Sequence, residues 1–109
     1  MLVPFPFTDL TGQKRRPALV ISPNRFDPED LVLCAITSRV PGRLLRWDVS
    51  LETRDLAEGA LPRPSIVKVG KLFTVHHALI VGRFGRIRPQ KLGEVLGTLQ
   101  RLFAPDVRG

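Results

Sequence analysis

Cysteine, histidine and long apolar runs are scarce in this sequence of 109 residues. The single cysteine, Cys34, excludes a disulfide within the chain, and its apolar neighbours predict a buried small side chain rather than a reactive thiol. One cysteine and two histidines are too few for a tetrahedral structural zinc site, so we expect no metal and no other cofactor. The longest apolar run, residues 31–36, is far shorter than the roughly 20 residues that span a bilayer, which excludes a transmembrane helix.

Signals for secretion and for several enzyme classes are also missing. No basic residue precedes an apolar stretch at the N-terminus, so we expect a cytoplasmic protein. The sequence has no P-loop, no dinucleotide-binding glycine motif, no zinc-peptidase motif and no hydrolase nucleophile motif, which disfavours those enzymes. Hydrophobic residues make up 43% and charged residues 25% of the chain, which is typical of one folded domain over residues 1–109.

Positive charge is concentrated in the second half of the chain. Seventeen Lys and Arg against ten Asp and Glu give a net charge of +7, and residues 59–109 hold this whole excess. Thirteen of the cations are Arg, whose planar guanidinium suits bidentate contacts to phosphate. The charge therefore favours a polyanionic partner such as nucleic acid, although many basic proteins are merely soluble cations.

Short apolar segments alternate with Pro, Gly, Asn and Asp, a pattern that predicts β-strands. The polar, cationic segment 8–15 indicates an exposed loop. Segments 23–30 and 55–64 contain prolines and are expected to be irregular. The expected strands cover residues 2–7, 17–22, 31–37, 45–51, 65–75 and 79–87.

One segment has a helical period. Pro89 suits a first helical turn and Pro105 ends the pattern. Gly93 and Gly97 inside it each cost roughly 1 kcal/mol relative to Ala, so packing against a sheet is needed to hold this helix. The prediction is a mainly β fold, a small and strongly curved barrel with a C-terminal helix. The apolar stripe of that helix comprises Leu92, Val95, Leu96, Leu99, Leu102 and Phe103.

Several stretches, in this order, resemble the MazF/PemK family of toxins from bacterial toxin–antitoxin modules. The resemblance covers nearly the whole chain and implies a small SH3-like β-barrel of the MazF/PemK/CcdB-like type. It also implies the toxin of a type II module, a sequence-selective, metal-independent endoribonuclease that cleaves single-stranded RNA, including mRNA. The matching stretches are VPFPFTD at 3–9, KRRPALVIS at 14–22, AITS at 35–38, IVKVGKLFT at 66–74 and GRI at 85–87, followed by the helix.

Partners are implied by the same resemblance. The family forms homodimers and is held in check by a cognate antitoxin with an acidic C-terminal segment. Operator DNA is bound only together with the antitoxin. No membrane partner is expected.

The resemblance also implies a catalytic pair. The family uses the arginine of an Arg-Pro step at the start of the second strand and a threonine at the end of the third, which correspond here to Arg16 and Thr37. A guanidinium suits the charge that develops on phosphate oxygens when the 2′-OH of RNA attacks the adjacent phosphate. The threonine hydroxyl can add a hydrogen bond to the same phosphate. The resemblance suggests a proton-transfer role for the arginine too, which its pKa above ~12 makes unusual.

Further residues are expected to bind RNA around this pair. Lys71 departs from the family, because many relatives carry an amide side chain there, and we expect it to bind phosphate rather than a base edge. The basic second half predicts a groove that attracts RNA and an acidic antitoxin segment alike, lined by some of Arg63, Lys68, Lys71, Arg83, Arg86 and Arg88. The expected RNA-binding set is Thr11, Gln13, Lys14, Arg15, Ser38, Lys71 and Arg86.

Ordinary structural roles compete with these assignments. An arginine before a proline is usually a solvated loop end, and a threonine at a strand edge is usually chosen for β propensity. Adjacent histidines, His76 and His77, point to opposite faces if they lie on a strand, so we expect them in a turn rather than flanking one phosphate. Among the aromatic residues, Phe26 is the best candidate to stack on a base, although it can equally pack under its own loop.

Two other functions remain open at this point. One is a gyrase-binding toxin of the same fold, and the other is a non-catalytic SH3-like module that binds nucleic acid. Family members usually have a further segment before the Phe-Pro-Phe stretch, so we expect a shortened first strand, with weaker pairing at that edge.

Overall fold

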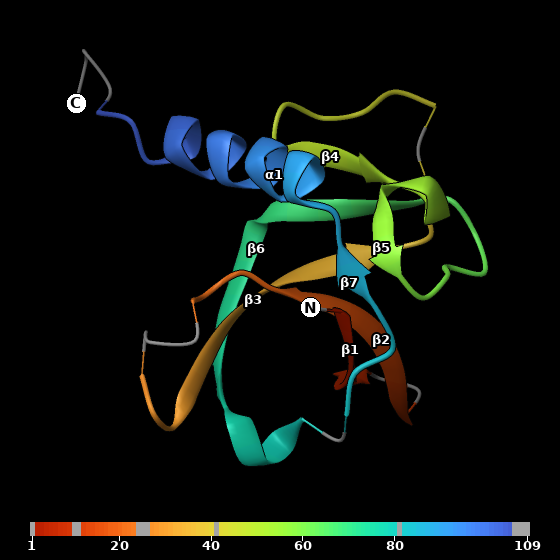
Figure 1. The fold of residues 1–109 in the computed structure, drawn as a ribbon, viewed down its shortest axis with the longest axis vertical. Coiled ribbons are helices and arrows are strands. Elements are labelled where there is room, and N and C mark those ends of the chain that lie inside the picture. The colour runs from red at the N-terminus through yellow and green to blue at the C-terminus, as the bar shows by residue number, and fades with distance from the viewer. Residues whose placement is uncertain (1, 10–11, 24–26, 41, 81, 106–109) are drawn as a thin grey trace.

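A five-stranded antiparallel sheet and a C-terminal helix make up most of the fold (Figure 1). The computed structural model describes residues 2–9, 12–23, 27–40, 42–80 and 82–105, and for residues 3–9 and 12–15 it describes the backbone alone. Across the sheet the strands follow the order β1 (Leu2–Asp9), β2 (Gly12–Val20), β3 (Asp30–Thr37), β6 (Ser65–His76) and β4 (Asp48–Leu51).

The remaining elements are short, apart from the helix. Strand β5 (Leu56–Glu58) pairs with β7 (Arg86–Ile87) in a second, two-stranded sheet. Two 3-10 turns, η1 (Thr53–Asp55) and η2 (His77–Leu79), precede β5 and follow β6, and α1 (Pro89–Leu102) ends the described fold. The mainly β fold with a C-terminal helix is thereby confirmed. No helix within the described ranges is long and apolar enough to cross a membrane.

The two sheets meet at the N-terminal edge. The backbone N–H of Leu2 donates to the carbonyl of Gly85 (2.9 Å), and the N–H of Phe84 donates to the carbonyl of Leu2 (3.0 Å). Gly59 has φ +84°, and a Cβ there would overlap the Phe84 carbonyl oxygen, so only glycine fits where this segment passes. These contacts curve the first strand of the large sheet toward β7.

The loop predicted at residues 8–15 is wrong in part, because most of these residues belong to the first β-hairpin. Strand β1 continues to Asp9 and β2 begins at Gly12, with register pairs from Leu2–Leu19 to Asp9–Gly12. A backbone ladder satisfies N–H and C=O groups whatever the side chains are, so strands can extend past the core. Strand β1 has eight residues, and its being shorter than in relatives stays a prediction.

Three other expected segments were wrong in part. Among the described residues of 79–87, only Arg86–Ile87 form a strand, and Gly82, with φ +126°, turns the chain before them. Within 55–64, expected to be irregular, β5 forms because it has β7 to pair with. In the segment 45–51, the strand starts at Asp48, because its carboxylate Oδ2 accepts the Leu45 N–H (2.9 Å) and closes a turn.

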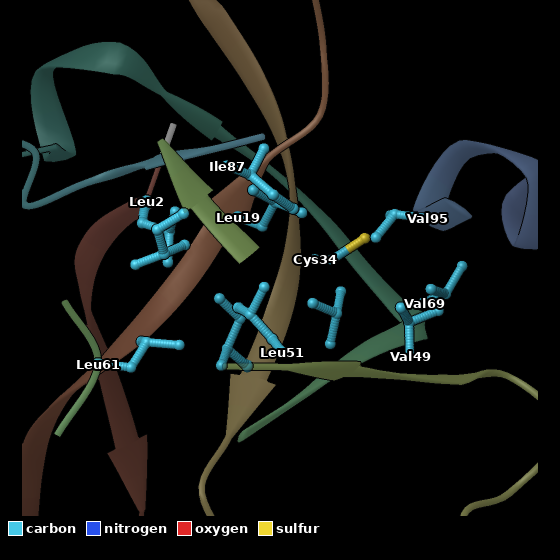
Figure 2. Packing of buried hydrophobic residues seen from close by; sticks show 12 residues of the cluster. Leu2, Leu19, Cys34, Val49, Leu51, Leu61, Val69, Ile87 and Val95 are labelled. Carbon is cyan, nitrogen blue, oxygen red and sulfur yellow. The ribbon is translucent and has the colours of Figure 1, made fainter. Parts of the chain in front are cut away.

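The main core lies between the large sheet and α1. Figure 2 shows Val95 of the helix directed toward Cys34 of β3, with Val69 and Val49 beside them. Cys34 is buried, as predicted, and burial raises the pKa of its thiol to about 11, which disfavours the reactive thiolate. The helical stripe is confirmed in part, because Leu96 and Phe103 are exposed.

The opposite face of strands β2, β3 and β6 carries a second, smaller cluster. Ala18 and Leu33 are its buried centre, and Phe73 packs against them. Because side chains alternate along a strand, every second residue from these positions shares their face. Arg16 lies two residues before Ala18 and Thr37 four residues after Leu33, so the same face continues into the candidate site.

Candidate functional site

Arg16 and Thr37 meet on neighbouring strands although they are 21 positions apart in the sequence. Strands β2 and β3 pair antiparallel, with Ala18 opposite Ala35. Arg16 lies two residues before Ala18 and Thr37 two residues after Ala35, so the register carries both to the same end and the same face. Both residues are half-buried.

A pocket of about 470 Å³ opens between them. Its floor comes from β3, where the small side chain of Ala35 leaves space between the longer side chains of β2 and β6. The residues that line the pocket are Arg16, Ala35, Ile36, Thr37, Arg39, Lys68 and Lys71.

Four of the seven lining residues are cations, and no carboxylate is among the lining residues that the structure describes. Arg16, Arg39 and Lys71 have no ion-pair partner within the described part of the chain. Like charges gathered around a hollow, with a low-dielectric wall behind them, focus the field on an anion. The pocket is therefore built to hold a group such as a phosphate.

A bulge in β6 brings Lys71 to this pocket. The register of β3 against β6 shifts between Cys34, which pairs with Leu72, and Ala35, which pairs with Lys68. Residues 69–71 are left between the two paired segments, and β6 turns a corner there, as Figure 1 shows. The bulge lets Val69 enter the core while Lys71 stays exposed at the pocket edge.

The hydroxyl of Thr37 is oriented by the chain that follows it. The backbone N–H of Arg39 donates to Thr37 Oγ1 at 3.1 Å. With its oxygen used as an acceptor, the hydroxyl keeps its own proton to donate. The same turn places the Arg39 side chain on the pocket wall.

Two smaller depressions adjoin the pocket. One, of about 230 Å³, shares Arg16 and Thr37 and adds Ser38, Leu61 and Pro62. The other, of about 220 Å³, shares Lys68 and Lys71 and is lined further by Leu45, Trp47, Asp48 and Gly70. An extended chain laid over the pocket would therefore find concave surface on both sides.

Trp47 is an aromatic residue beside the site that the sequence did not single out. It is half-buried, and the Arg46 guanidinium lies 4.8 Å from the centre of its ring. An Arg-Trp dipeptide before a short strand gives no signal of this position, because only the pairing of β4 with β6 brings it beside Lys71.

The predicted site residues fall into three groups. Arg16, Thr37 and Lys71 line the pocket, and Ser38 lines the adjoining depression. Arg86 lies elsewhere, on β7, where it pairs with Glu58 at 3.2 Å. The predicted residues that lie outside the described residues or side chains are Thr11, Gln13, Lys14, Arg15 and Phe26.

The basic groove predicted from the second half of the chain is not continuous. Lys68 and Lys71 line the pocket, whereas Arg63 borders a separate depression. The Nη2 atom of Arg83 lies 3.7 Å from Oε2 of Glu58, and Nε of Arg88 donates to the Arg54 carbonyl oxygen at 2.9 Å. The first half of the chain supplies Arg16 and Arg39 to the pocket instead, so the net charge of each half did not locate the site.

The two histidines stand in a turn, as expected. His76 ends β6 and its Nδ1 accepts the Ala78 N–H at 3.0 Å, while His77 begins η2. Their rings stack with centroids 4.6 Å apart. Neither residue lines the pocket.

The sequence matches a known protein family, and the fold matches solved structures. Residues 1–103 match the family described as PemK-like, MazF-like toxin of type II toxin–antitoxin system. A MazE–MazF complex from Deinococcus radiodurans is similar with TM-score 0.70 and 25% identity, over 96% of this chain and 92% of that chain. No curated protein sequence matches the chain.

Two mycobacterial structures share the fold. The Mycobacterium tuberculosis toxin MazF-mt6 is similar with TM-score 0.68 and 22% identity, over 94% of this chain and 98% of that chain. An endoribonuclease in complex with its cognate antitoxin, from a mycobacterial species, has TM-score 0.67 and 20% identity, over 95% and 94% of the two chains.

Proposed function

The chain belongs to the PemK-like, MazF-like family of toxins of type II toxin–antitoxin systems, and from this premise we propose that it is an endoribonuclease that cleaves single-stranded RNA. The observation that carries the proposal is the cationic pocket in which Arg16 and Thr37 meet. A solved relative that shares the fold is described as an endoribonuclease in complex with its antitoxin.

The proposed reaction uses the ribose itself as nucleophile. The 2′-OH attacks the adjacent phosphorus, its proton leaves, and the bond to the 5′ oxygen of the next nucleotide breaks as that oxygen takes up a proton. The products are a 2′,3′-cyclic phosphate and a 5′-hydroxyl. Arg16 stabilises the charge on the phosphate oxygens, and the Thr37 hydroxyl donates a hydrogen bond to the same group.

Some of the residues around Arg16 and Thr37 bind the RNA and do not take part in the chemical step. Arg39 and Lys71 hold the phosphate at the pocket rim, and Ser38 contacts the neighbouring nucleotide in the adjoining depression. Arg86 is held by Glu58, so we do not retain it in the RNA-binding set.

Partners follow from the proposal and from the relatives. We propose a homodimer that is inhibited by a cognate antitoxin, whose acidic segment suits the unpaired cations of the pocket. The Deinococcus radiodurans relative is a complex of MazE with MazF. Operator DNA is bound by the toxin only with the antitoxin, and the proposed action on mRNA places the protein in the cytoplasm.

RNA cleavage by the purified protein tests this function. We expect a single-stranded transcript to be cut at a few sites in the presence of EDTA, resolved on a denaturing gel. The described residues contain no group of three or more His, Cys, Asp or Glu that could hold a metal. Binding of RNA without cleavage would favour the non-catalytic module, and inhibition of gyrase with intact RNA would favour the gyrase-binding toxin.

Thr37→Val tests the hydroxyl alone. Valine keeps the branched shape and the β propensity and loses only the exposed acceptor for the Arg39 N–H, so the variant should fold with a slightly lowered melting temperature. We expect the single-turnover cleavage rate to fall by between ~10-fold and ~10²-fold, because a hydrogen bond to a charged phosphate contributes about 1.5–3 kcal/mol. Thr98→Val, which removes a hydroxyl that donates to the Glu94 carbonyl on α1 and lies outside the pocket and its adjoining depressions, is the control. An unchanged rate in Thr37→Val would leave Thr37 a structural residue.

A further inference from the structure

Asp48 is a buried carboxylate at the edge of the pocket. It is the first residue of β4, and its side chain is 3% exposed. Oδ1 accepts from Lys68 Nζ at 3.0 Å, and Oδ2 accepts from the Leu45 backbone N–H at 2.9 Å. Each oxygen is therefore bound by a different segment, the pocket strand β6 on one side and the turn before β4 on the other.

Lys68 lies between the pocket and the depression beside Trp47. Its backbone pairs with Ala35 of β3 on one side and with Asp48 of β4 on the other. It lines both hollows, and its side chain is 23% exposed. An ammonium has three N–H donors, and Asp48 uses one of them, so two remain for an anion in the pocket.

The other cations of the pocket are not held by a carboxylate among the described residues. Arg39 and Lys71 are exposed and have no ion-pair partner within the described residues. A long exposed side chain loses rotamer freedom when it binds a phosphate. Lys68 is already ordered by Asp48, so the geometry needed in the transition state exists before RNA arrives.

The same contact has an opposite effect on binding. The carboxylate offsets the charge of Lys68, so the pair attracts a polyanion less than a free lysine does. Asp48 therefore acts on rate and on affinity in opposite directions.

We propose that Asp48 is a positioning residue for RNA cleavage: it holds the Lys68 ammonium toward the scissile phosphate, which raises the rate of the chemical step at the expense of RNA affinity. The inference rests on the proposed function. The contact between Asp48 and Lys68, and its effect on RNA in the pocket, are separate from the roles proposed for Arg16 and Thr37.

Asp48→Asn separates the two effects. Asparagine has the same size and keeps an oxygen for the Leu45 N–H, but it removes the charge that holds Lys68. We expect kcat to fall by between ~10-fold and ~10²-fold, the usual result of misplacing a group by about 1 Å. We expect KM to fall severalfold and the salt dependence of binding to steepen by a slope of about 0.7, because the site gains one net positive charge when the carboxylate is removed.

A double-mutant cycle with Lys68→Met decides whether Asp48 acts through Lys68. In the Lys68→Met background, Asp48→Asn should leave kcat unchanged, because no ammonium remains to be placed. An equal fall in kcat in both backgrounds would show that Asp48 acts through its turn, and would overturn the inference. The double variant removes both charges of the buried pair, so it avoids the unpaired carboxylate of Lys68→Met alone.

Asp55→Asn is the matched control. Asp55 also accepts a backbone N–H, that of Glu52 at 2.8 Å, and faces a lysine, Lys91 at 3.8 Å, but it lies outside the pocket. In this variant kcat, KM and the slope of the salt dependence should be the same as in the wild type. Melting temperatures of all variants identify any loss of fold.

A binding measurement keeps this inference separate from the proposed function. The probe is a short single-stranded 2′-O-methyl RNA of random sequence, which has no nucleophilic 2′-OH. If the wild type cleaves no RNA, the proposed function fails, and affinity for this probe still tests the pair. Tighter, more salt-dependent binding by Asp48→Asn supports the inference, and unchanged affinity overturns it.

Discussion

Arg16→Ala is expected to lower the rate of RNA cleavage by ~10²–10³, the usual cost of removing one preorganised donor from a site where charge develops. Arg16 is half-buried on β2 and lines both the main pocket and the depression beside Ser38. Its guanidinium has no ion pair within the described residues, so its charge is available to the phosphate. The loss should appear in kcat more than in KM.

The fold should survive this substitution. No ion pair or hydrogen bond of Arg16 is broken among the described contacts, and the core cluster lies on the other face of the sheet. Melting temperature and circular dichroism should match the wild type. Arg16→Lys keeps the charge without the planar fork and should retain an intermediate rate.

Arg54→Ala is the control for Arg16→Ala. The Arg54 side chain is 81% exposed and pairs with Glu52 at 2.9 Å, an exposed contact worth little to stability. It removes the same charge from the chain without touching the pocket, so cleavage should be unchanged. A wild-type rate in folded Arg16→Ala protein would end the catalytic assignment of Arg16.

A single deoxyribose at the scissile nucleotide is expected to abolish cleavage at that position. The proposed reaction takes its nucleophile from the 2′ oxygen, and the four cations and one threonine of the pocket offer no replacement. Binding should persist, because the phosphates that the cations contact are unchanged. The comparison needs two oligonucleotides that differ by one oxygen atom, spanning a site mapped on a longer transcript.

Product ends give the second readout of this experiment. The all-ribose substrate should yield a 2′,3′-cyclic phosphate and a 5′-hydroxyl, identified by mass spectrometry. Moving the deoxyribose one nucleotide away should restore cleavage. Cutting of the deoxy-substituted bond at the all-ribose rate would mean that water, not the ribose, attacks the phosphorus.

Local patterns were enough to predict the elements whose cause is local. Pro89 and the apolar stripe after it predicted α1, and short apolar segments between turn-forming residues predicted β3 and most of β6. Such patterns are physical because one face of each element has to be buried. Cys34 was predicted to be buried for the same reason.

The site was predicted in part, and for a different reason. The order of the motifs, rather than charge, indicated Arg16 and Thr37, and the pairing of β2 with β3 brings them to one pocket. The positive charge of the second half pointed to Arg86 of β7, but in the structure Arg86 pairs with Glu58 of β5. A residue's charge says nothing about its neighbours until the strands are paired.

What the sequence by itself determined is the helix, most of the longer strands, their order and most of the buried stripes, because each depends on residues close together in the chain. Only the tertiary structure decided which cations share a pocket. The bulge at residues 69–71 brings Lys71 to Arg16, and the pairing of Asp48 with Lys68 joins residues 20 positions apart. These contacts depend on strand register, and a shift of one residue would turn each side chain to the other face of the sheet.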